Sequence, residues 1–405
     1  MAADDLTAVV VGGGIGGLAS AVALAQAGWR VTVLERAPAL GEVGAGLATT
    51  GNGMTALAAL GLAEAARAVA YQTGTAGMQD SRGRWIMRMP DTRSDPGAVT
   101  TIWGLQRQRL HGVLRAAAEA ADGIELVTDA EVIAVKPGEP GQSGQPGQPG
   151  GEPASVTWRA GDGEQTATAD LVVAADGVRS ALRAQLFPAA PARYSGSTSW
   201  RAVIADTDSE DRLVQAWGPG TEFGSLRVSP AEIYWYGYFR NPEGAVFADE
   251  LGAARERFAT WAPWVRGLVD KTPADRLLRH DVYHLPGGLP AYANGRVVFV
   301  GDAAHAMLPT AGQGAASALE DGVCVGRMIG APVAAGGELA AALAAYDGAR
   351  RPRCRQIART AIMSARFGCD LGGGWRQPVR NAIFRMLPPA PLLKAGQSIV
   401  RWTAP

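Results

Sequence analysis

Several residue types are scarce in this chain of 405 residues, and each shortage excludes a class of protein. There are three cysteines, and no two of them form a C-x-x-C pair, which argues against a dithiol redox centre or a cysteine-rich zinc site and favours a reducing compartment. The formal net charge is +0, so the chain lacks the basic excess of a nucleic-acid-binding protein. We therefore expect no metal centre and no nucleic-acid partner.

Long uncharged stretches are also scarce, and the one between Leu6 and Trp29 is crowded with glycine. The chain continues as a strand from Arg30 onward. Asp4 and Asp5 stand before the apolar run, where a signal peptide would carry positive charge. We expect no membrane span and a cytoplasmic protein.

Strand and helix patterns alternate over much of the chain, which is typical of an α/β fold. Residues 8–11, 16–27 and 30–34 predict a strand, a helix and a second strand, and residues 101–121 have the apolar spacing of a helix. Further strands are expected at 125–135, 154–160, 171–175 and 296–300.

Three other segments have a different texture. Residues 137–153 are rich in proline and glycine and predict a mobile surface insert at a hairpin tip. Residues 198–239 contain four alternating runs with many aromatics, which predicts an antiparallel sheet in a second domain. From Leu339 to the end the pattern is helical, with breaks at glycines 372–374 and prolines 388–389.

The glycines of the first strand–helix turn carry a dinucleotide-binding pattern. Gly12, Gly14 and Gly17, with Ile15 and Gly16 between them, directly follow the strand and open the helix. The glycines allow a tight turn, a close approach of backbone N–H groups to a pyrophosphate, and close packing of helix on strand. Glu35 ends the next strand, about 20 residues on, at the spacing of a ribose-binding acid.

A second glycine-rich strand end lies almost three hundred residues downstream. Gly301-Asp302 follows a strand-like run, and Pro309 and Gly312-Gln313-Gly314 precede a helix expected from about Ala315. Two such turns in one chain suggest a single long cofactor held at both ends. Arg107 and Asp176 support a cofactor site only together with the other motifs. Taken alone, an arginine such as Arg107 is usually solvated, and an acid such as Asp176 after a strand is commonly a helix cap.

These motifs, taken in order, resemble the single-component (group A) FAD-dependent monooxygenases, the aromatic-ring hydroxylases related to p-hydroxybenzoate and salicylate hydroxylases. The resemblance rests on Gly12–Gly17 with Glu35, Arg107, Asp176-Gly177, and Gly301-Asp302 with the 312–314 glycines, and it covers essentially the whole chain. It implies that Gly12, Gly14, Ile15, Gly16 and Gly17 hold the FAD pyrophosphate, with Glu35 on the adenosine ribose and Arg36 against the adenine.

The same resemblance implies roles for the remaining cofactor residues. Arg107 and Val132 would contact FAD, Asp176 would belong to a motif shared between FAD and NAD(P)H, and Asp302 would bind the ribityl or pyrophosphate region. The helix opening at Gly312, Gln313 and Gly314 would direct its positive N-terminus at the flavin, where reduced flavin is anionic. His305 is expected to be structural.

The expected architecture is a Rossmann-like FAD-binding domain (1–70, 101–185 and 280–335), a mixed or antiparallel β-sheet substrate domain (71–100 and 186–279) and a C-terminal helical region (336–405). Phe223, Ser225, Arg227 and Trp235 on the aromatic sheet, together with Pro309, are expected to bind the substrate. Arg227 would pair with an acidic substrate or be solvated, and Glu222 would act as a base or have no catalytic role. No catalytic residue is firmly expected, because the flavin carries the chemistry.

The expected function is therefore NAD(P)H-consuming insertion of one O2 oxygen, as hydroxylation or epoxidation through a flavin C4a-hydroperoxide, into an aromatic or polycyclic small molecule of natural-product biosynthesis or aromatic catabolism. A flavin reductase or dehydrogenase of the same fold acting on an isoprenoid, and a non-catalytic flavin-fold binding protein, are the alternatives. The choice between NADH and NADPH stays open, as does that between monomer and homodimer.

Overall fold

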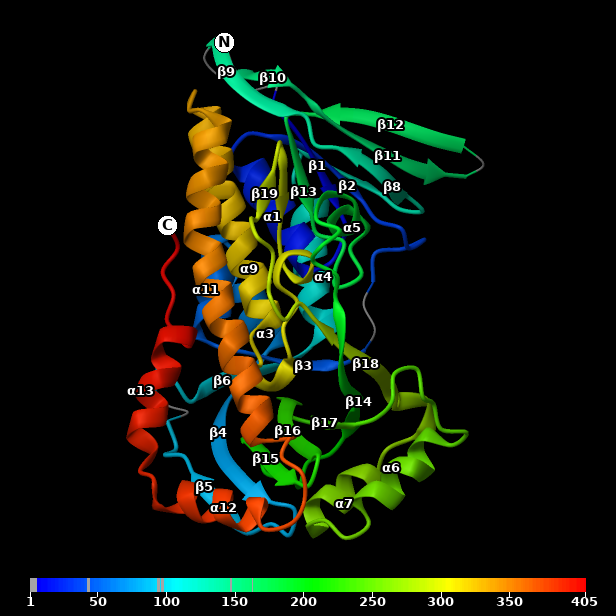
Figure 1. The fold of residues 1–405 in the computed structure, drawn as a ribbon, viewed down its shortest axis with the longest axis vertical. Helices are drawn as coiled ribbons and strands as arrows, with labels where there is room; N and C mark the ends of the chain where they lie inside the picture. The colour runs from blue at the N-terminus through cyan, green and yellow to red at the C-terminus, as the bar shows by residue number, and fades with distance from the viewer. Residues whose placement is uncertain (1–5, 42–43, 93–94, 96–97, 146–147, 162) are drawn as a thin grey trace.

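The computed structural model describes residues 6–41, 44–92, 95, 98–145, 148–161 and 163–405. The molecule is elongated, with a parallel sheet in its upper part and a large mixed sheet in its lower part (Figure 1). One long helix, α11 (Leu339–Phe367), runs beside both parts and joins them.

The upper part is built on a six-stranded sheet in the order β19-β20-β13-β1-β2-β7. All neighbouring pairs are parallel except β19 with β20. The strands are β1 (Thr7–Val11), β2 (Arg30–Leu34), β7 (Ile124–Val127), β13 (Leu171–Ala174), β19 (Ala293–Asn294) and β20 (Val297–Phe299). The predicted strand–helix–strand unit is confirmed, with α1 at Ile15–Gln26 between β1 and β2.

Two helices that are distant in sequence, α1 and α9 (Gly314–Cys324), pack closely because small residues line their contact. A Cβ added to Gly322 would lie 2.6 Å from the Cβ of Ala19, and one added to Gly326, in the π-helical turn Val325–Gly330, 2.6 Å from the Cβ of Ala23. Both glycines therefore fix how near the two helices stand.

A smaller antiparallel sheet and a hairpin extend the upper part. The sheet has the order β12-β11-β8, with β8 at Glu131–Lys136, β11 at Ala154–Ala160 and β12 at Gly163–Ala169. Since β8 pairs with β11, the proline- and glycine-rich insert does connect two paired strands, as predicted. It forms a hairpin of its own, β9 (Glu139–Gln145) with β10 (Gln148–Glu152).

The lower part is a nine-stranded sheet in the order β18-β14-β17-β16-β15-β4-β6-β3, with β5 paired to β4. Helices α6 (Glu250–Phe258) and α7 (Pro263–Asp270) pack on one face. The strands are β3 (Gly46–Thr49), β4 (Tyr71–Asp80), β5 (Trp85–Arg88), β6 (Thr101–Gln106), β14 (Arg193–Ala205), β15 (Leu213–Gly218), β16 (Thr221–Ser229), β17 (Glu232–Arg240) and β18 (Leu278–His284).

Three details differ from the sequence expectations. Residues 101–106 were expected to be helical, but they form β6, and α4 (Arg107–Glu119) begins only after it. The expected single strand over 125–135 is two strands, β7 and β8, in different sheets. β3, β6 and most of β18 belong to the nine-stranded sheet although their residues were assigned to the cofactor domain, so the boundaries drawn there do not follow the sheets.

The tail is helical, as expected, and breaks near the predicted sites. After α11, the chain forms α12 (Arg376–Met386) and α13 (Pro389–Val400). The remaining helices are α2 (Gly51–Ala59), α3 (Ala63–Val69), α5 (Ala181–Leu186), α8 (Asp302–His305) and α10 (Ala331–Ala334). Within the described ranges no helix combines the length and the apolar character that a membrane crossing needs.

Candidate active site

The motifs of the sequence analysis meet at one edge of the six-stranded sheet. Gly12 follows β1, Glu35 follows β2, Asp176 lies just after β13, and Gly301 lies just after β20. These four strands are neighbours in the order β20-β13-β1-β2, and they run parallel. Ligands of such sheets bind outside the carboxyl ends of the strands, so this edge is where a nucleotide belongs.

The glycine loop after β1 is held by backbone contacts that leave no room for side chains. Gly12 has φ +107°, and a Cβ there would lie 2.5 Å from the carbonyl oxygen of Ala175, while a Cβ on Gly17 would overlap the carbonyl oxygen of Gly12. Glu35 accepts a hydrogen bond from the N–H of Gly13 (2.7 Å) and another from that of Ala37 (2.9 Å). Glu35 therefore also supports the loop, a role the sequence did not indicate.

Two helix N-termini face this edge without a side-chain cap. Neither α1 nor α9 has a capping side chain or an acidic residue in its first turn, whereas Ser180 caps α5 and Asp249 caps α6. Cβ atoms added to Gly14, Gly312 and Gly314 would meet nothing within 4 Å. Unfilled space beside uncapped N–H groups suits an anionic group such as a pyrophosphate or a reduced flavin.

The start of α1 and the turn after β20 both lie against α9. A Cβ on Gly16, in the first turn of α1, would lie 3.4 Å from the Cβ of Ala318 on α9, and one on Gly301 would lie at the same distance from Ala318. The structure thus brings together the two glycine-rich ends that are separated by nearly the whole chain. This is the geometry needed to hold both halves of one long cofactor.

Asp176 has an unused hydrogen-bonding atom in this arrangement. Its Oδ2 accepts from the N–H of Leu182 (3.1 Å), but its Oδ1 is buried and has no hydrogen-bond partner within the described part of the chain. Burial raises the pKa of this carboxyl, partly offset by hydrogen bonds from Ser180 and from backbone N–H groups. An orphaned buried acceptor fits a ligand that brings a donor, such as a hydroxyl group.

Other predicted cofactor residues occupy varied positions. Asp302 and Arg36 are exposed at the same edge, and Arg107 begins α4 with its N–H bonded to the carbonyl of Ala45 (2.8 Å). Ile15 and Val132 are buried in the core, 4% and 9% exposed, and so offer little surface to a ligand. Their roles stay predictions.

One face of the nine-stranded sheet is directed toward the loop before α9. On that face Tyr236 and Tyr238 cluster with Leu308 of the loop and with Ala361 and Ala365 of α11. Glu222 belongs to the same face because it pairs with Tyr238 across β16 and β17. This wall, which we call the candidate substrate wall, is therefore built from β16, β17, α11 and the 308–311 loop.

The predicted substrate residues Phe223 and Trp235 lie on the opposite face, which corrects that expectation. Their rings stack at 5.2 Å within the core formed against α6 and α7. Ser225 pairs with Trp235 and is 2% exposed, so it too lies on the far face. Aromatic residues occur on both faces of these strands, and only the helices covering one face decide which points inward.

Arg227 is also a structural residue in this fold. Its guanidinium donates to the backbone oxygens of Asp206 (2.6 Å) and Ser209 (2.9 Å), and it is 4% exposed. The side chain therefore organises the 206–211 turn. The pairing of Arg227 with an acidic substrate, one of the two expectations, is not supported by this placement.

Glu222 is the acidic group of the substrate face. It is 1% exposed, and its Oε1 accepts from the hydroxyl of Tyr236 (2.8 Å) and the amide of Gln215 (2.9 Å). Burial raises its pKa to about 7, with the hydrogen bonds opposing the shift. A carboxyl that titrates near neutrality can accept or return a proton under ordinary conditions.

A basic group on the same face was missed by the sequence analysis. Arg201 pairs with Tyr236, and His280 lies one strand further at the register of Ser199. Burial and the nearby charges of Arg201, Arg107 and Arg279 lower the pKa of His280 to about 4. Arg201 and His280 thus share the face of Glu222, with the charge of Arg107 nearby, whereas Arg279 lies on the other face and pairs with Glu250 and Asp281. Only the spatial meeting of β14, β18 and α4 reveals this cluster.

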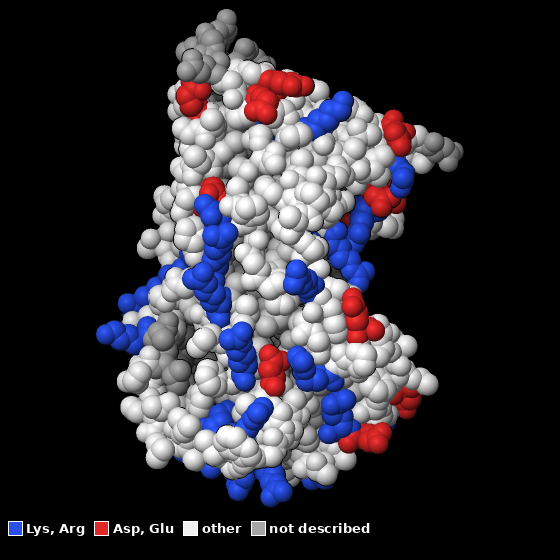
Figure 2. Space-filling view, viewed as in Figure 1, with Lys and Arg blue, Asp and Glu red and all other residues white. Residues whose placement is uncertain are grey.

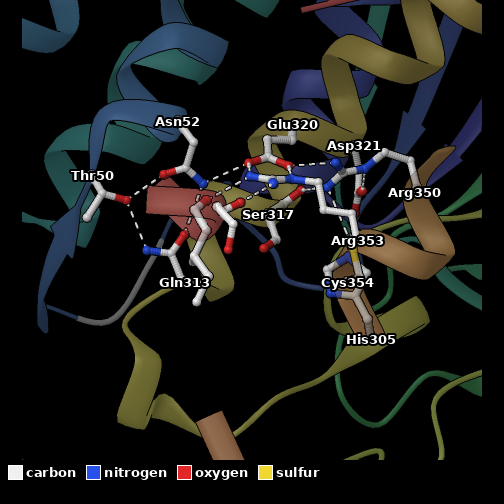
Figure 3. Close-up of polar contacts among 12 residues, drawn as sticks. Thr50, Asn52, His305, Gln313, Ser317, Glu320, Asp321, Arg350, Arg353 and Cys354 are labelled. Atoms are coloured by element: carbon white, nitrogen blue, oxygen red, sulfur yellow. Dashed lines mark hydrogen bonds and ion pairs between the residues drawn. The ribbon is translucent and has the colours of Figure 1, made fainter. Parts of the chain in front are cut away.

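A buried polar network lies directly behind the N-terminus of α9 (Figure 3). Asn52 on α2 donates to Gln313 (2.9 Å) and to Glu320 (2.7 Å), and Gln313 donates to Thr50 (2.9 Å). Gln313, a predicted cofactor residue, thus directs its side chain into the protein. Its contribution toward a ligand would be through its backbone.

Ion pairs continue this network into α11. Arg350 contacts Glu320 (2.5 Å) and Asp321 (2.6 Å), and Arg353 makes a second contact with Glu320 (2.6 Å). Asp321 also accepts from the N–H of Gly301 (2.8 Å) in the turn after β20. The acidic residues of α9 therefore tie α11 to the glycine turn.

His305 completes the network, in agreement with a structural role. Its Nε2 lies 2.6 Å from Asp321. Burial alone would lower its pKa, but the neighbouring Cys354 and Asp321 raise it well above its ordinary value. His305, Asp321 and Cys354 have metal-ligand atoms within 4.8 Å of one another, yet Arg350 already bonds Asp321 and contacts Cys354 at 3.6 Å, so a positive charge is supplied there by the protein.

Comparison with known proteins agrees with this geometry. A family model described as FAD binding domain matches residues 5–361. The chain belongs to this family. The aurachin C monooxygenase/isomerase of Stigmatella aurantiaca is 34% identical over 386 residues and 94% of each chain, and 2-heptyl-3-hydroxy-4(1H)-quinolone synthase of Pseudomonas aeruginosa is 30% identical over 95% of each chain.

Further relatives extend the comparison. Salicylate hydroxylase of Pseudomonas putida is 33% identical over 87% of this chain and 83% of its own. The solved structure of Klebsiella pneumoniae HpxO complexed with FAD and uric acid has a TM-score of 0.80 at 23% identity, covering 98% of this chain and 96% of that chain. The expectations of an FAD-binding fold and of an FAD-dependent aromatic monooxygenase are confirmed.

Replacing Gly17 with alanine should weaken FAD binding by this monooxygenase. The added methyl group would overlap the carbonyl oxygen of Gly12, so the loop must open. Its N–H groups would then no longer point at the pyrophosphate of FAD. FAD affinity, measured by fluorescence titration, should fall about tenfold or more. Gly112→Ala on α4, where a Cβ meets nothing within 4 Å, is the control; equal affinities of the two variants would contradict the assignment.

Glu222→Gln should remove a pH dependence of stability. Because the folded pKa is raised from 4.5 to about 7, the unfolded chain loses the proton first as pH rises, and folding becomes less favourable between these two values and constant above them. The penalty is about 3 kcal/mol. Urea unfolding from pH 4.5 to pH 8 should show this decline in the parent and not in the variant, whereas the exposed Glu164→Gln should retain it.

Arg350→Met should destabilise the fold far more than Arg351→Met. The first leaves Glu320 and Asp321 buried without their shared cation, a loss of about 3–5 kcal/mol. The second breaks only the half-buried i,i+4 pair with Asp347, a loss of up to about 1 kcal/mol. Denaturant unfolding measures both, and similar losses for the two neighbours would refute the importance of the buried network.

Proposed function

We propose that this monooxygenase acts on a planar N-heteroaromatic compound with an apolar substituent, of the 4-quinolone or quinoline type. The carrying observation is Glu222, an acidic group with a pKa near 7 on the face directed at the 308–311 loop. A ring N–H or ring hydroxyl that must be deprotonated to activate the ring is the partner such a group suits.

The chemistry of the surrounding wall supports this class. Leu308, Ala361, Ala365 and the ring of Tyr238 form an apolar cluster, which suits an aromatic ring system and an alkyl chain. The carboxyl of Glu222 disfavours a substrate that itself carries a carboxylate at that position. Two relatives that match over 94% and 95% of this chain are named for aurachin C and for a heptyl quinolone, which supports the same class.

Each part of the site then has a task. FAD supplies the oxygen-transfer chemistry when it is bound, reduced by NADH or NADPH and reacting with O2. The N–H groups at the starts of α1 and α9 hold its anionic parts, and Asp176 Oδ1 accepts a hydroxyl. Tyr236 and Gln215 hold Glu222 in place by donating to its Oε1, and this carboxyl would accept the substrate proton.

The proposed activity also implies a cellular compartment. A cytoplasmic site of action would give the enzyme NAD(P)H and O2, and the buried free cysteines Cys324, Cys354 and Cys369 suit a reducing compartment. We place the protein there, as a monomer or a homodimer. A role in natural-product biosynthesis or aromatic catabolism follows from the same relatives.

Substrate-stimulated turnover tests this proposal. With the FAD-loaded enzyme, a 2-alkyl-4(1H)-quinolone should accelerate NAD(P)H oxidation, and the product should contain one oxygen atom from ¹⁸O₂. Salicylate and urate, with their different charge and polarity, should accelerate it much less. Glu222→Gln should lower the quinolone rate and remove the rise in rate that accompanies ionisation near pH 7.

Three outcomes would count against the proposal. Preference for salicylate or urate over the quinolone would reject the substrate class. NAD(P)H oxidation that never places labelled oxygen in a product would instead favour the reductase or dehydrogenase alternative. An unchanged pH profile in Glu222→Gln would remove Glu222 from the reaction.

A further inference from the structure

Exposed large hydrophobic side chains are concentrated at one place on the molecule. Eight such side chains are exposed in the described part of the chain, and all except Val246 lie between residues 363 and 387. We call these seven the apolar patch. They are Met363 (54% exposed), Phe367 (48%), Trp375 (72%), Val379 (46%), Ile383 (47%), Met386 (77%) and Leu387 (46%).

The helix α12 is amphipathic, but its apolar side is exposed and its buried side contains polar residues, the opposite of an ordinary surface helix. Trp375, Val379, Ile383 and Met386 are spaced at intervals of four, four and three residues, so they share one side, and that side is exposed. The side that faces the protein includes Arg380 and Asn381, which are 5% and 6% exposed. An apolar face directed at solvent marks an interaction site.

Polar contacts, together with one aromatic anchor, hold α12 in this orientation. Arg380 donates to the carbonyls of Phe367 (2.8 Å) and Gly368 (3.4 Å) at the end of α11, and it lies over the ring of Trp217 at 5.1 Å. Phe384 packs edge-on against Trp217 at 5.9 Å. Because these contacts fix the buried side, the helix cannot simply roll over to hide its apolar face.

The same segment carries a strong positive charge. Residues 348–405 contain eleven arginine and lysine residues and one acidic residue, Asp370, in a chain whose net charge is +0. Arg350, Arg351 and Arg353 are paired within the protein, but Arg376 and Lys394 are exposed. Figure 2 shows basic side chains along the lower edge, where Figure 1 places α12.

We propose that α12 and the end of α11 dock the enzyme on an anionic phospholipid surface. The apolar patch would enter the boundary between headgroups and acyl chains, with Trp375 at the interface. Arg376, Arg366 and Lys394 would lie near the lipid phosphates. This proposal concerns a helix lying in the surface, not a membrane span, and it does not depend on the substrate.

Charge favours lipid over a second copy of the chain as the occupant. A two-fold dimer through the patch would place it against itself and would bring its exposed basic residues together, while the neighbouring acids Asp370 and Asp80 are already paired with arginines. An anionic bilayer instead offers an opposite charge to every one of the exposed basic residues.

Vesicle flotation with the full-length FAD-loaded enzyme tests the proposal. Vesicles of phosphatidylcholine containing about one quarter phosphatidylglycerol should retain the enzyme, and pure phosphatidylcholine or high salt should release most of it. The double variant Trp375→Ser, Met386→Ser should bind the anionic vesicles about tenfold less tightly. Arg376→Gln with Lys394→Gln should reduce binding and its salt dependence.

Matched controls come from elsewhere on the surface. Val246→Ser removes an apolar side chain as exposed as Trp375, and Arg30→Gln removes an exposed arginine of the upper part. Both should bind vesicles like the parent. Circular dichroism and bound FAD confirm that each variant is folded, and the single variant Met386→Ser, at the most exposed position of the patch, provides a second test.

Three results would overturn the proposal. The first is failure of the parent enzyme to bind anionic vesicles. The second is equal loss of binding in the Val246→Ser control. The third is a dimer, seen by analytical ultracentrifugation, that persists with vesicles present and dissociates in the Trp375→Ser, Met386→Ser variant, since this would assign the patch to a second copy.

Discussion

The pairing of Glu320 and Asp321 with Arg350 is the interaction on which the rest of the site depends. All three side chains are essentially inaccessible, so none can exchange its partner for water. Burying charges carries a large desolvation penalty, and only close pairing and complete hydrogen bonding offset it. The pairs are short, and Asn52, Ser317 and Arg353 supply further hydrogen bonds to the same groups.

The geometry of these pairs is transmitted to the cofactor edge through backbone atoms. Asp321 accepts from the N–H of Gly301, and its pKa is lowered to about 2 because His305 and Arg350 outweigh the effect of burial. It therefore stays ionised and holds the glycine turn after β20. At the start of the same helix, Gln313 is fixed by Asn52 and Thr50. The segment from Gly301 to Gln313 is thus held at both ends by side chains of the buried network. Its other side, which would face a ligand, consists of backbone and open space.

Local features were predictable from sequence, and features that depend on distant partners were not. The unit from β1 to β2 and the strand β11 were located well, because periodicity and glycine placement act within a few residues. Phe223 and Trp235 were placed on the wrong face, because both faces of β16 and β17 carry aromatics and α6 and α7 decide between them. The hydrogen bond from Asn52 to Glu320 joins residues 268 positions apart, and no pattern in the sequence predicts it.

The long helix α11 connects the two halves of this arrangement. One part of it supplies Arg350 and Arg353 to the buried network, and its end contributes Ala361 and Ala365 to the candidate substrate wall. The residue that follows it, Gly368, sits where a Cβ would be 3.3 Å from the Glu222 carboxylate, and its carbonyl accepts from Arg380 of α12. Cofactor edge, candidate substrate wall and exposed apolar surface therefore share one rigid element. Arg380 contacts the chain at Gly368, next to Glu222, whereas the ion pairs of Arg350 and Arg353 hold α11 further from its end.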